Sequence, residues 1–275
     1  MAKAKHQKQS KHQVRAIPTA PNVTTRASEP PEYTLFSNSN VKPALLSLLL
    51  IGFLLRVVNL DALSLWVDEF VHVLPAKKFT EGTGSLMTKD NNGILLTFTM
   101  LPFVKLFGAT AFWARLPSVL FGVGSIYLLY RIGTRMFNRY VGFLAAFAST
   151  FSLYLIFWSR IARNYAIFGF FFLLLAWVFL QAFEKTKDPN YSGFWKKNGL
   201  SSKYSLLLMP VLAGALLSHQ LTFFFGFSVS MYAIIVAAQK FISRSEDRFN
   251  NKYVWLGALS LPLLILAMPG VYNIL

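Results

Sequence analysis

The chain has 275 residues, of which 55% are hydrophobic and 14% charged, with a formal net charge of +16 and no cysteine. Soluble domains carry about 25% charged residues, so this composition excludes an ordinary soluble enzyme, and the lack of cysteine excludes disulfides and thiolate chemistry. The 27 Lys and Arg residues cluster in the N-terminal segment and in loops between apolar blocks, which points to anionic membrane lipids rather than nucleic acid as their partner.

Residues 1–42 are basic and polar, contain four prolines and show no apolar periodicity, which predicts a disordered cytoplasmic tail. The first apolar run begins only near Pro43, and no cleavage-like site follows it. We therefore expect the first span to stay in the protein as an anchor rather than to be removed as a signal peptide. Residues 43–275 are expected to form one transmembrane module.

Seven apolar blocks of this module are long enough to cross a bilayer, which predicts an all-α integral membrane protein with about seven transmembrane helices. The blocks cover residues 43–60, 112–130, 140–158, 164–183, 204–218, 221–239 and 253–272. An eighth block, 94–107, would extend about 21 Å, whereas the hydrocarbon core of a bilayer is about 30 Å thick. We expect this shorter block to form a helix that lies at the membrane interface.

The basic residues test that choice, because one additional span would invert every later loop. If 94–107 does not cross and the N-terminus is cytoplasmic, twelve basic residues in three loops all face the cytoplasm, as the positive-inside rule requires. They are Arg131, Arg135, Arg139, Lys185, Lys187, Lys196, Lys197, Lys203, Lys240, Arg244, Arg248 and Lys252. Residues 61–111 then form one large external loop, and Leu275 lies outside.

Five of the eleven acidic residues lie in this external loop: Asp61, Asp68, Glu69, Glu81 and Asp90. Asp68 and Glu69 follow Trp66 shortly after the first span, and adjacent residues on a helix point about 100° apart, which indicates different roles. One could be a general base while the other binds a metal ion, a substrate hydroxyl or a structural partner. Alternatively, Trp66 anchors the loop at the interface and both acids are solvated.

Three arginines and one histidine face the same external side in this topology. Arg160 and Arg163 lie between two spans, and Arg115 lies at the mouth of the second one. Guanidinium groups at this height could hold a lipid phosphate, or they could extend to headgroups or pair with an acid of the loop. His219, in a tight turn, is a candidate ligand or a structural residue.

The motifs around these residues resemble, in order, those of the GT-C type polytopic glycosyltransferases that use polyprenyl-phosphate sugars. This family includes protein O-mannosyltransferases and the lipid A aminoarabinose transferase. The segments that carry the resemblance are Leu65–Glu69, Leu106–Gly108, Arg115–Ser118, Tyr130–Gly133, and Ser159–Arg160 followed by Arg163–Tyr165. The likeness runs from about residue 43 to 183, and more loosely to the end.

The resemblance implies a multi-pass fold whose first external loop carries short helices along the membrane. It also implies that Asp68 is the base that deprotonates an acceptor hydroxyl, which displaces the polyprenyl phosphate with inversion. Arg115 and Arg163, with Arg160 behind them, are the candidates that neutralise the phosphate, and Glu69 supports the site. Tyr165 and His219 are further substrate-binding candidates. The two carboxylates could also hold a divalent metal ion.

The sequence departs from the resemblance at two places. Family members commonly show Pro-Pro-Leu before the interfacial helix, whereas this chain has Asp90-Asn91-Asn92-Gly93-Ile94-Leu95, which makes Asp90 a candidate second acid that contacts substrate. Relatives also usually continue through more spans, so we expect a fragment, a split subunit or a minimal form.

The sequence therefore predicts an inverting glycosyltransferase in a bacterial inner (cell) membrane. It would move a hexose or pentose from a polyprenyl-phosphate donor to an acceptor lipid, glycan or protein. One alternative is a non-catalytic subunit that needs a partner subunit to complete its site. A flippase for lipid-linked sugars is a second alternative, but it predicts charges deep within several spans, whereas the charges lie near the ends of the blocks.

Overall fold

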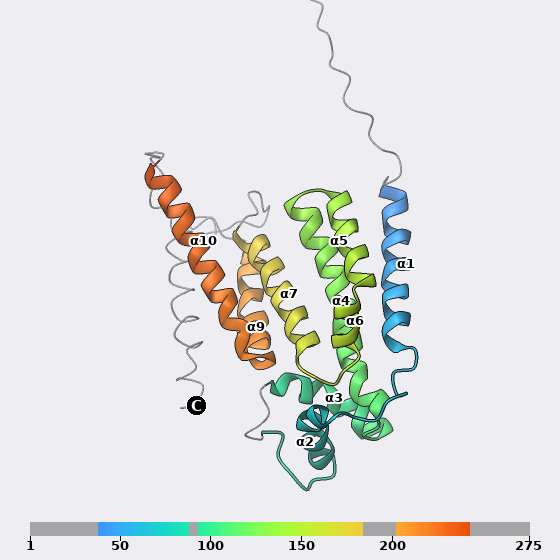
Figure 1. Ribbon diagram of the computed structural model, residues 1–275. Coiled ribbons are helices and arrows are strands. Elements are labelled where there is room, and N and C mark those ends of the chain that lie inside the picture. The colour runs from blue at the N-terminus through green and yellow to red at the C-terminus, as the bar shows by residue number, and fades with distance from the viewer. Residues whose placement is uncertain (1–37, 88–92, 184–201, 243–275) are drawn as a thin grey trace, which may run out of the picture. The chain divides into compact units, whose positions relative to one another are not determined.

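The computed structural model describes residues 38–87, 93–183 and 202–242 of the chain. All of them belong to one compact unit, Phe36–Leu275. The described residues form helices joined by turns, with no strand among them (Figure 1). The all-α prediction is therefore confirmed for this part of the chain.

Helices α1 (Asn38–Val57) and α4 (Ala111–Met136) correspond to the first two predicted spans, with longer or shifted ends. α1 begins five residues before Pro43, so residues 38–42, predicted as the end of a disordered tail, are helical. α4 continues through Arg131 and Arg135, because a helix satisfies its own backbone whether or not lipid surrounds it. The rest of the predicted tail, residues 1–37, lies outside the described residues.

The third predicted span, 140–158, is two helices rather than one. α5 (Arg139–Phe151) and α6 (Leu153–Ser159) meet at Ser152 with a bend of 62°. The backbone of Ser152 is extended, and its hydroxyl accepts a hydrogen bond from Leu155 N at 3.4 Å. Ser152 therefore acts as an N-cap that starts α6.

The later helices follow the predicted blocks closely. α7 covers Tyr165–Phe183, α9 covers Ser202–Ser218, and the short turn η3 (Gln220–Thr222) leads into α10 (Phe223–Ile242). Along the chain, α1, α4, the α5–α6 pair, α7, α9 and α10 alternate in direction (Figure 1). The seventh predicted span, 253–272, lies outside the described residues.

Three described helices are long and apolar enough to cross a membrane, namely α1, α4 and α7. The bent pair α5–α6 makes a fourth if it is counted as one span. The chain is therefore a multi-pass membrane protein with three to four candidate spans among its described residues.

The segment between α1 and α4 contains three further helical pieces: η2 (Val67–Glu69), α2 (Phe70–Thr80) and α3 (Ile94–Phe107). The bounds of α3 are those predicted for the short apolar block. Gly93, which precedes α3, has φ 141°, and a Cβ at this position would collide with Ser218 O and the side chain of Asn164. A residue without Cβ is needed where α3 starts beside the α6–α7 and α9–η3 turns.

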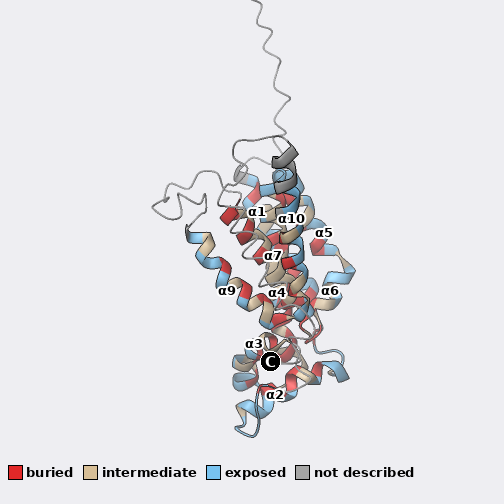
Figure 2. Cartoon of the chain, turned by 90° about the vertical axis from the view of Figure 1, so that its left-hand side faces the viewer, coloured by how far each residue is buried: buried red, intermediate tan, exposed pale blue. Residues whose placement is uncertain are grey.

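Two clusters of buried apolar side chains pack the helices against one another. Buried residues of α2, α3, α4, α7 and the turn before α7 form one cluster, consisting of Val73, Ala76, Leu96, Met100, Val104, Ala114, Ala162 and Ile167. A second cluster joins α7, α9 and α10 around Leu175, Phe179 and Phe225. Figure 2 shows buried positions concentrated around α2 and α3 and along α4 and α7. α4 contacts α1, α3, α5, α6 and α7, so it is the central helix of the described bundle.

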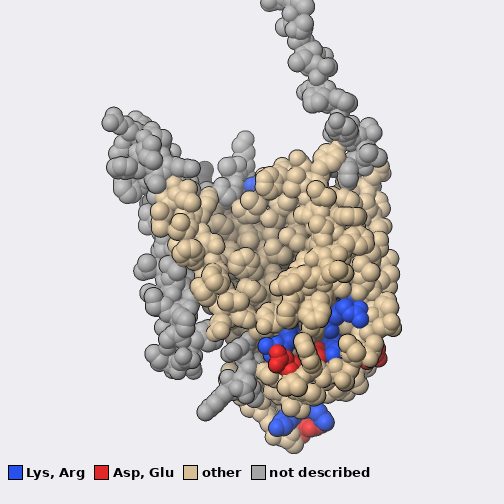
Figure 3. All heavy atoms as spheres, in the orientation of Figure 1, with Lys and Arg blue, Asp and Glu red and all other residues tan. Residues whose placement is uncertain are grey.

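The charged side chains are unevenly placed. In Figure 3, nearly all visible Lys, Arg, Asp and Glu gather at the end that carries α2 and α3, and the helical surface of this face beyond them is tan apart from a small blue patch near the top. This end holds the candidate residues of the external loop.

Candidate active site

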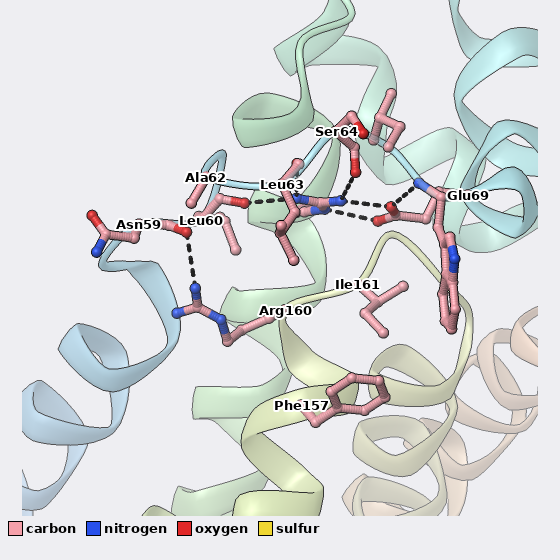
Figure 4. Close-up of a pocket in the computed structure, with 12 residues that line it drawn as sticks. Asn59, Leu60, Ala62, Leu63, Ser64, Glu69, Phe157, Arg160 and Ile161 are labelled. Atoms are coloured by element: carbon pink, nitrogen blue, oxygen red, sulfur yellow. Dashed lines mark hydrogen bonds and ion pairs between the residues drawn. The ribbon is translucent and has the colours of Figure 1, made fainter.

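Glu69 and Arg115 form a buried ion pair where η2 meets α4. Two hydrogen bonds join them, Arg115 Nε to Glu69 Oε1 at 2.8 Å and Arg115 Nη2 to Oε2 at 2.7 Å. The backbone N–H groups of Ala162 and Trp66 donate to the same carboxylate at 2.6 and 2.8 Å. The bond from Trp66 is the arrangement of a capping box, in which the third residue of a helix turns back to the residue that precedes it. The bonds that Glu69 accepts from Arg115 and Trp66 are drawn in Figure 4.

The guanidinium of Arg115 is fully used by the protein. Besides Glu69, it donates to the carbonyl oxygens of Leu60 and Leu63 through Nη1 and of Ser64 through Nη2, at 2.8, 2.9 and 2.9 Å. A guanidinium carries five N–H groups and a carboxylate accepts about four hydrogen bonds. Arg115 therefore has no N–H left for a phosphate, and Glu69 has no lone pair left for a proton from substrate.

The pKa of Glu69 reflects these contacts. Burial raises the pKa, but hydrogen bonds from Arg115, Ala162 and Trp66 and the positive charge of Arg115 outweigh burial and bring the pKa below its ordinary value. Glu69 is thus an anion at neutral pH. Its geometry is that of a residue that fixes the loop after α1.

Asp68 lies next to Glu69 in η2 but in the opposite environment. Its residue is exposed, and its carboxylate makes no hydrogen bond or ion pair with any described residue. Only its backbone is held, because Arg163 Nη1 donates to the carbonyl oxygen of Asp68 at 2.9 Å. The two carboxylates of the pair therefore lie in different environments: that of Glu69 is buried and fully hydrogen-bonded, and that of Asp68 is exposed.

Arg163 lies at the turn between α6 and α7, beside Asp68. Within the described part of the chain it makes a single hydrogen bond, so most of its N–H groups have no partner among the described residues. Its guanidinium lies 5.8 Å from the ring centroid of Tyr165, within the range of a cation–π contact. Asp68, Arg163 and Tyr165 are therefore brought together by η2 and the α6–α7 turn.

His219 joins this group from the turn between α9 and η3. Its ring centroid is 6.1 Å from that of Tyr165, and its Nδ1 accepts a hydrogen bond from Leu221 N at 3.0 Å. Burial and the nearby charge of Arg163 lower the pKa of His219 below its ordinary value. A neutral ring with Nδ1 as acceptor carries its proton on Nε2, which is the atom that could donate to substrate.

The guanidinium of Arg160 binds backbone carbonyls near the end of α1. It donates to four carbonyl oxygens at the end of α1 and just after it, those of Leu55, Arg56, Val58 and Asn59, at 3.2, 3.2, 2.7 and 2.9 Å. Leu55 and Arg56 lie in the last turn of α1, whose carbonyls lack partners within the helix, so Arg160 caps α1. Asp90, the remaining predicted residue, lies outside the described residues.

Two cavities flank the site. One of about 510 Å³ has the Glu69–Arg115 pair in its wall and Phe157 and Ile161 opposite it (Figure 4). The other, of about 400 Å³, is mainly apolar and reaches from Tyr165 along α4, α6 and α7, with Gly122, Trp158, Phe168 and Leu173 in its lining. In the described residues no three His, Asp or Glu side chains gather as a metal site would require.

One residue with a structural role near the site was not predicted from the sequence. Arg56 lies inside the first apolar block and is fully buried, with hydrogen bonds to α5 and α6. The signal was present, because an ionisable residue within a span is expensive and usually functional. Arg56 lies near the end of its block, where the sequence pattern does not distinguish it from a charge at the membrane surface.

Comparison with known proteins supports the resemblance. The family described as dolichyl-phosphate-mannose-protein mannosyltransferase matches residues 91–272, which is more than half of the chain and includes Arg115, Arg160, Arg163, Tyr165 and His219. Asp68 and Glu69 precede the matched range. No curated protein and no solved structure matches the chain. The chain belongs to the dolichyl-phosphate-mannose-protein mannosyltransferase family, and it is a multi-pass membrane glycosyltransferase.

Proposed function

We propose that this protein is an inverting glycosyltransferase that moves a sugar from a polyprenyl-phosphate donor to an acceptor hydroxyl at the external face of the membrane. The observation that carries the proposal is the difference between the two carboxylates of η2. Glu69 is saturated by hydrogen bonds, whereas the carboxylate of Asp68 is exposed, without a partner among the described residues, and adjacent to Arg163.

Asp68 would act as the general base. It takes the proton of the acceptor hydroxyl while the acceptor oxygen forms a bond to the anomeric carbon of the sugar. The bond from that carbon to the phosphate oxygen breaks, and its electron pair leaves with the polyprenyl phosphate. Attack from the face opposite the leaving group inverts the anomeric centre. Because phosphate is a good leaving group, one base and charge neutralisation are sufficient.

Arg163 would supply the charge neutralisation, because it donates to fewer of the described residues than Arg115 or Arg160 does. Tyr165 and the Nε2–H of His219 would add contacts to the same phosphate or sugar. A divalent ion is an alternative source of positive charge, and transfer assays with and without EDTA decide between them.

The donor lipid would enter from the hydrocarbon side. The apolar cavity of about 400 Å³ begins at Tyr165 and extends away from the charged residues, which suits an isoprenoid chain whose phosphate lies near Arg163. We also propose a topology of seven spans with a cytoplasmic N-terminus, which the basic residues of the loops support, and we place α2 and α3 at the outer interface of a bacterial inner membrane.

Replacement of Asp68 tests the proposal directly. Asp68→Asn should abolish transfer from a synthetic polyprenyl-phosphate sugar while leaving the thermal unfolding temperature unchanged, because the exposed carboxylate has no described partner to lose. Asp61→Asn, an exposed acid of the same loop, is the matched control and should transfer normally. Normal turnover by Asp68→Asn would sink the mechanism.

A further inference from the structure

Arg56 is a fully buried cation in a helix that is long and apolar enough to cross a membrane. It makes no ion pair with a described residue, and its hydrogen-bond partners among the described residues are all neutral oxygens. A cation in such a position is costly unless many dipoles surround it, so its partners indicate its role.

Those partners lie at the break between α5 and α6. Arg56 Nη2 donates to Ser149 O at 3.1 Å, and Nη1 donates to Thr150 O at 3.3 Å. Both carbonyls belong to the last turn of α5, where the bend at Ser152 removes the helical partners they would have had. Arg56 therefore supplies to the broken span the hydrogen bonds that lipid cannot.

The same guanidinium also reaches the end of α6. Its Nε donates to Ser159 Oγ at 3.3 Å, and a fourth bond goes back to Gly52 O at 3.0 Å. Gly122 of α4 makes room for this contact, because a Cβ there would collide with Ser159 Oγ and lie 3.4 Å from Arg56 Nε. α1, α4 and α6 thus meet around one side chain.

Arg160, the residue after Ser159, makes the reverse connection. It caps the end of α1 through the carbonyls of Leu55, Arg56, Val58 and Asn59. Each arginine therefore occupies carbonyls at the end of another helix, Arg56 at the end of α5 and Arg160 at the end of α1. The two together hold the ends of α1 and α6 side by side.

The segment they hold leads directly into the proposed active site. Two residues after Arg160, the N–H of Ala162 donates to Glu69 Oε1 at 2.6 Å. The next residue, Arg163, donates to Asp68 O at 2.9 Å. A shift of residues 159–163 would move both contacts and displace the cation from the base.

We propose that Arg56 is a positioning residue for sugar transfer. From within the membrane-spanning helix α1 it fixes the turn 159–163, and that turn sets Arg163 against Asp68. The effect on transfer rests on the proposed function, whereas the effect on the turn does not. Since small misplacements of catalytic groups cost about 100-fold in rate, we expect Arg56→Met to lower kcat by about that factor with little change in acceptor KM.

A double-variant cycle distinguishes positioning from general loss of structure. If Arg56 acts through Arg163, the double variant Arg56→Met/Arg163→Gln should show no lower kcat/KM than Arg163→Gln alone. If the double variant instead lost kcat/KM by the product of the two single-variant factors, the proposal would be overturned. Arg56→Lys retains the charge but not the fork of donors, and it provides a milder variant for the same cycle if the Met variant does not fold. Arg131→Met, an exposed arginine of α4, is the control and should leave kcat unchanged.

Hydrogen exchange on the full chain in detergent provides a readout that needs no transfer. Arg56→Met or Arg56→Lys should accelerate exchange of the Ala162 amide, and Arg131→Met should not. Unchanged exchange at Ala162 in both Arg56 variants would overturn the positioning role. If Asp68→Asn retained transfer while exchange at Ala162 rose in the Arg56 variants, the proposed function would fail and the role of Arg56 in holding the turn would stand.

Discussion

At the scale of single residues, two arginines of the site end differ in how their N–H groups are used. Arg115 donates to five oxygens of the protein, and Arg163 donates to one among the described residues. Replacement of the two arginines is therefore expected to affect different properties of the protein, although both carry the same charge and both lie just before a helix or in its first turns.

Arg163→Gln should raise the KM for the donor and lower kcat, with little change in the unfolding temperature. Arg115→Gln should instead destabilise the protein by about 3–5 kcal/mol, because it leaves the buried carboxylate of Glu69 without its charged partner. Donor titrations and thermal unfolding of both variants in the same detergent measure the difference. Equal losses of stability in the two variants would contradict the assignment.

Glu69 gives a pH dependence with a definite sign. Its folded pKa lies below the ordinary value of 4.5, so the folded state binds this proton less readily than the unfolded state does. The stabilisation is complete above about pH 4.5 and is lost as the pH falls through the lower folded pKa. Unfolding temperatures measured from pH 6 down to 3 should therefore fall more steeply for the parent protein than for Glu69→Gln, which starts lower. Parallel curves would contradict this linkage.

The residue scale also shows what sequence could predict. Adjacent positions and the 100° rotation per residue indicated that Asp68 and Glu69 differ, but they did not indicate which one is buried. That depends on Arg115, 46 positions further along the chain, and on the N–H of Ala162, 93 positions further. Local patterns contain no information on which carboxylate a distant guanidinium reaches, so Arg115 was predicted as a phosphate ligand.

At the scale of elements, the junction before α3 depends on a glycine. Gly93 combines φ 141° with contacts to Ser218 O and Asn164 that leave no space for a Cβ. Gly108, after α3, also has a positive φ of 84°, but nothing lies within 4 Å of its hypothetical Cβ. A side chain at Gly108 would therefore cause backbone strain alone, whereas a side chain at Gly93 would cause backbone strain and a steric collision.

Gly108→Ala should cost only the strain of an unfavourable φ, about 1–3 kcal/mol. Gly93→Ala should cost more than this, and it should also reduce transfer, because the displaced start of α3 presses on the turns that carry Arg163 and His219. Unfolding temperatures and kcat for both variants test the comparison. A Gly93→Ala protein no less stable and no less active than Gly108→Ala would show that α3 adapts without disturbing the site.

Helix bounds were predictable where apolar length determines them, as the agreement of α3 with the block 94–107 shows. The break within 140–158 was not predictable. The residues on both sides of Ser152 are apolar, and hydropathy does not show whether the axis of an apolar helix bends. The bend depends on the hydroxyl of Ser152, which caps α6, and on the hydrogen bonds that Arg56 donates to the carbonyl oxygens of Ser149 and Thr150. The first is a matter of capping geometry and the second is a tertiary contact.

At the scale of the whole molecule, the site lies at one end of the helices and the described basic cluster lies at the other. Arg131, Arg135 and Arg139 belong to the end of α4 and the start of α5, one helix length of α4 from Arg115. For a membrane protein this separation has a topological meaning, because basic loops stay in the cytoplasm. The proposed external site therefore depends on α3 not crossing the bilayer.

The absence of cysteine allows this topology to be tested in intact cells. Ser85→Cys places a thiol at an exposed position after α2, and Met136→Cys places one at the exposed end of α4. If α3 does not cross, only α4 separates the two positions. A membrane-impermeant maleimide should then label Ser85→Cys in intact cells and Met136→Cys only after permeabilisation. If α3 crosses, both positions lie on one side and both variants react together, so labelling of Met136→Cys in intact cells would refute the external loop 61–111. The parent protein, which has no thiol, sets the background.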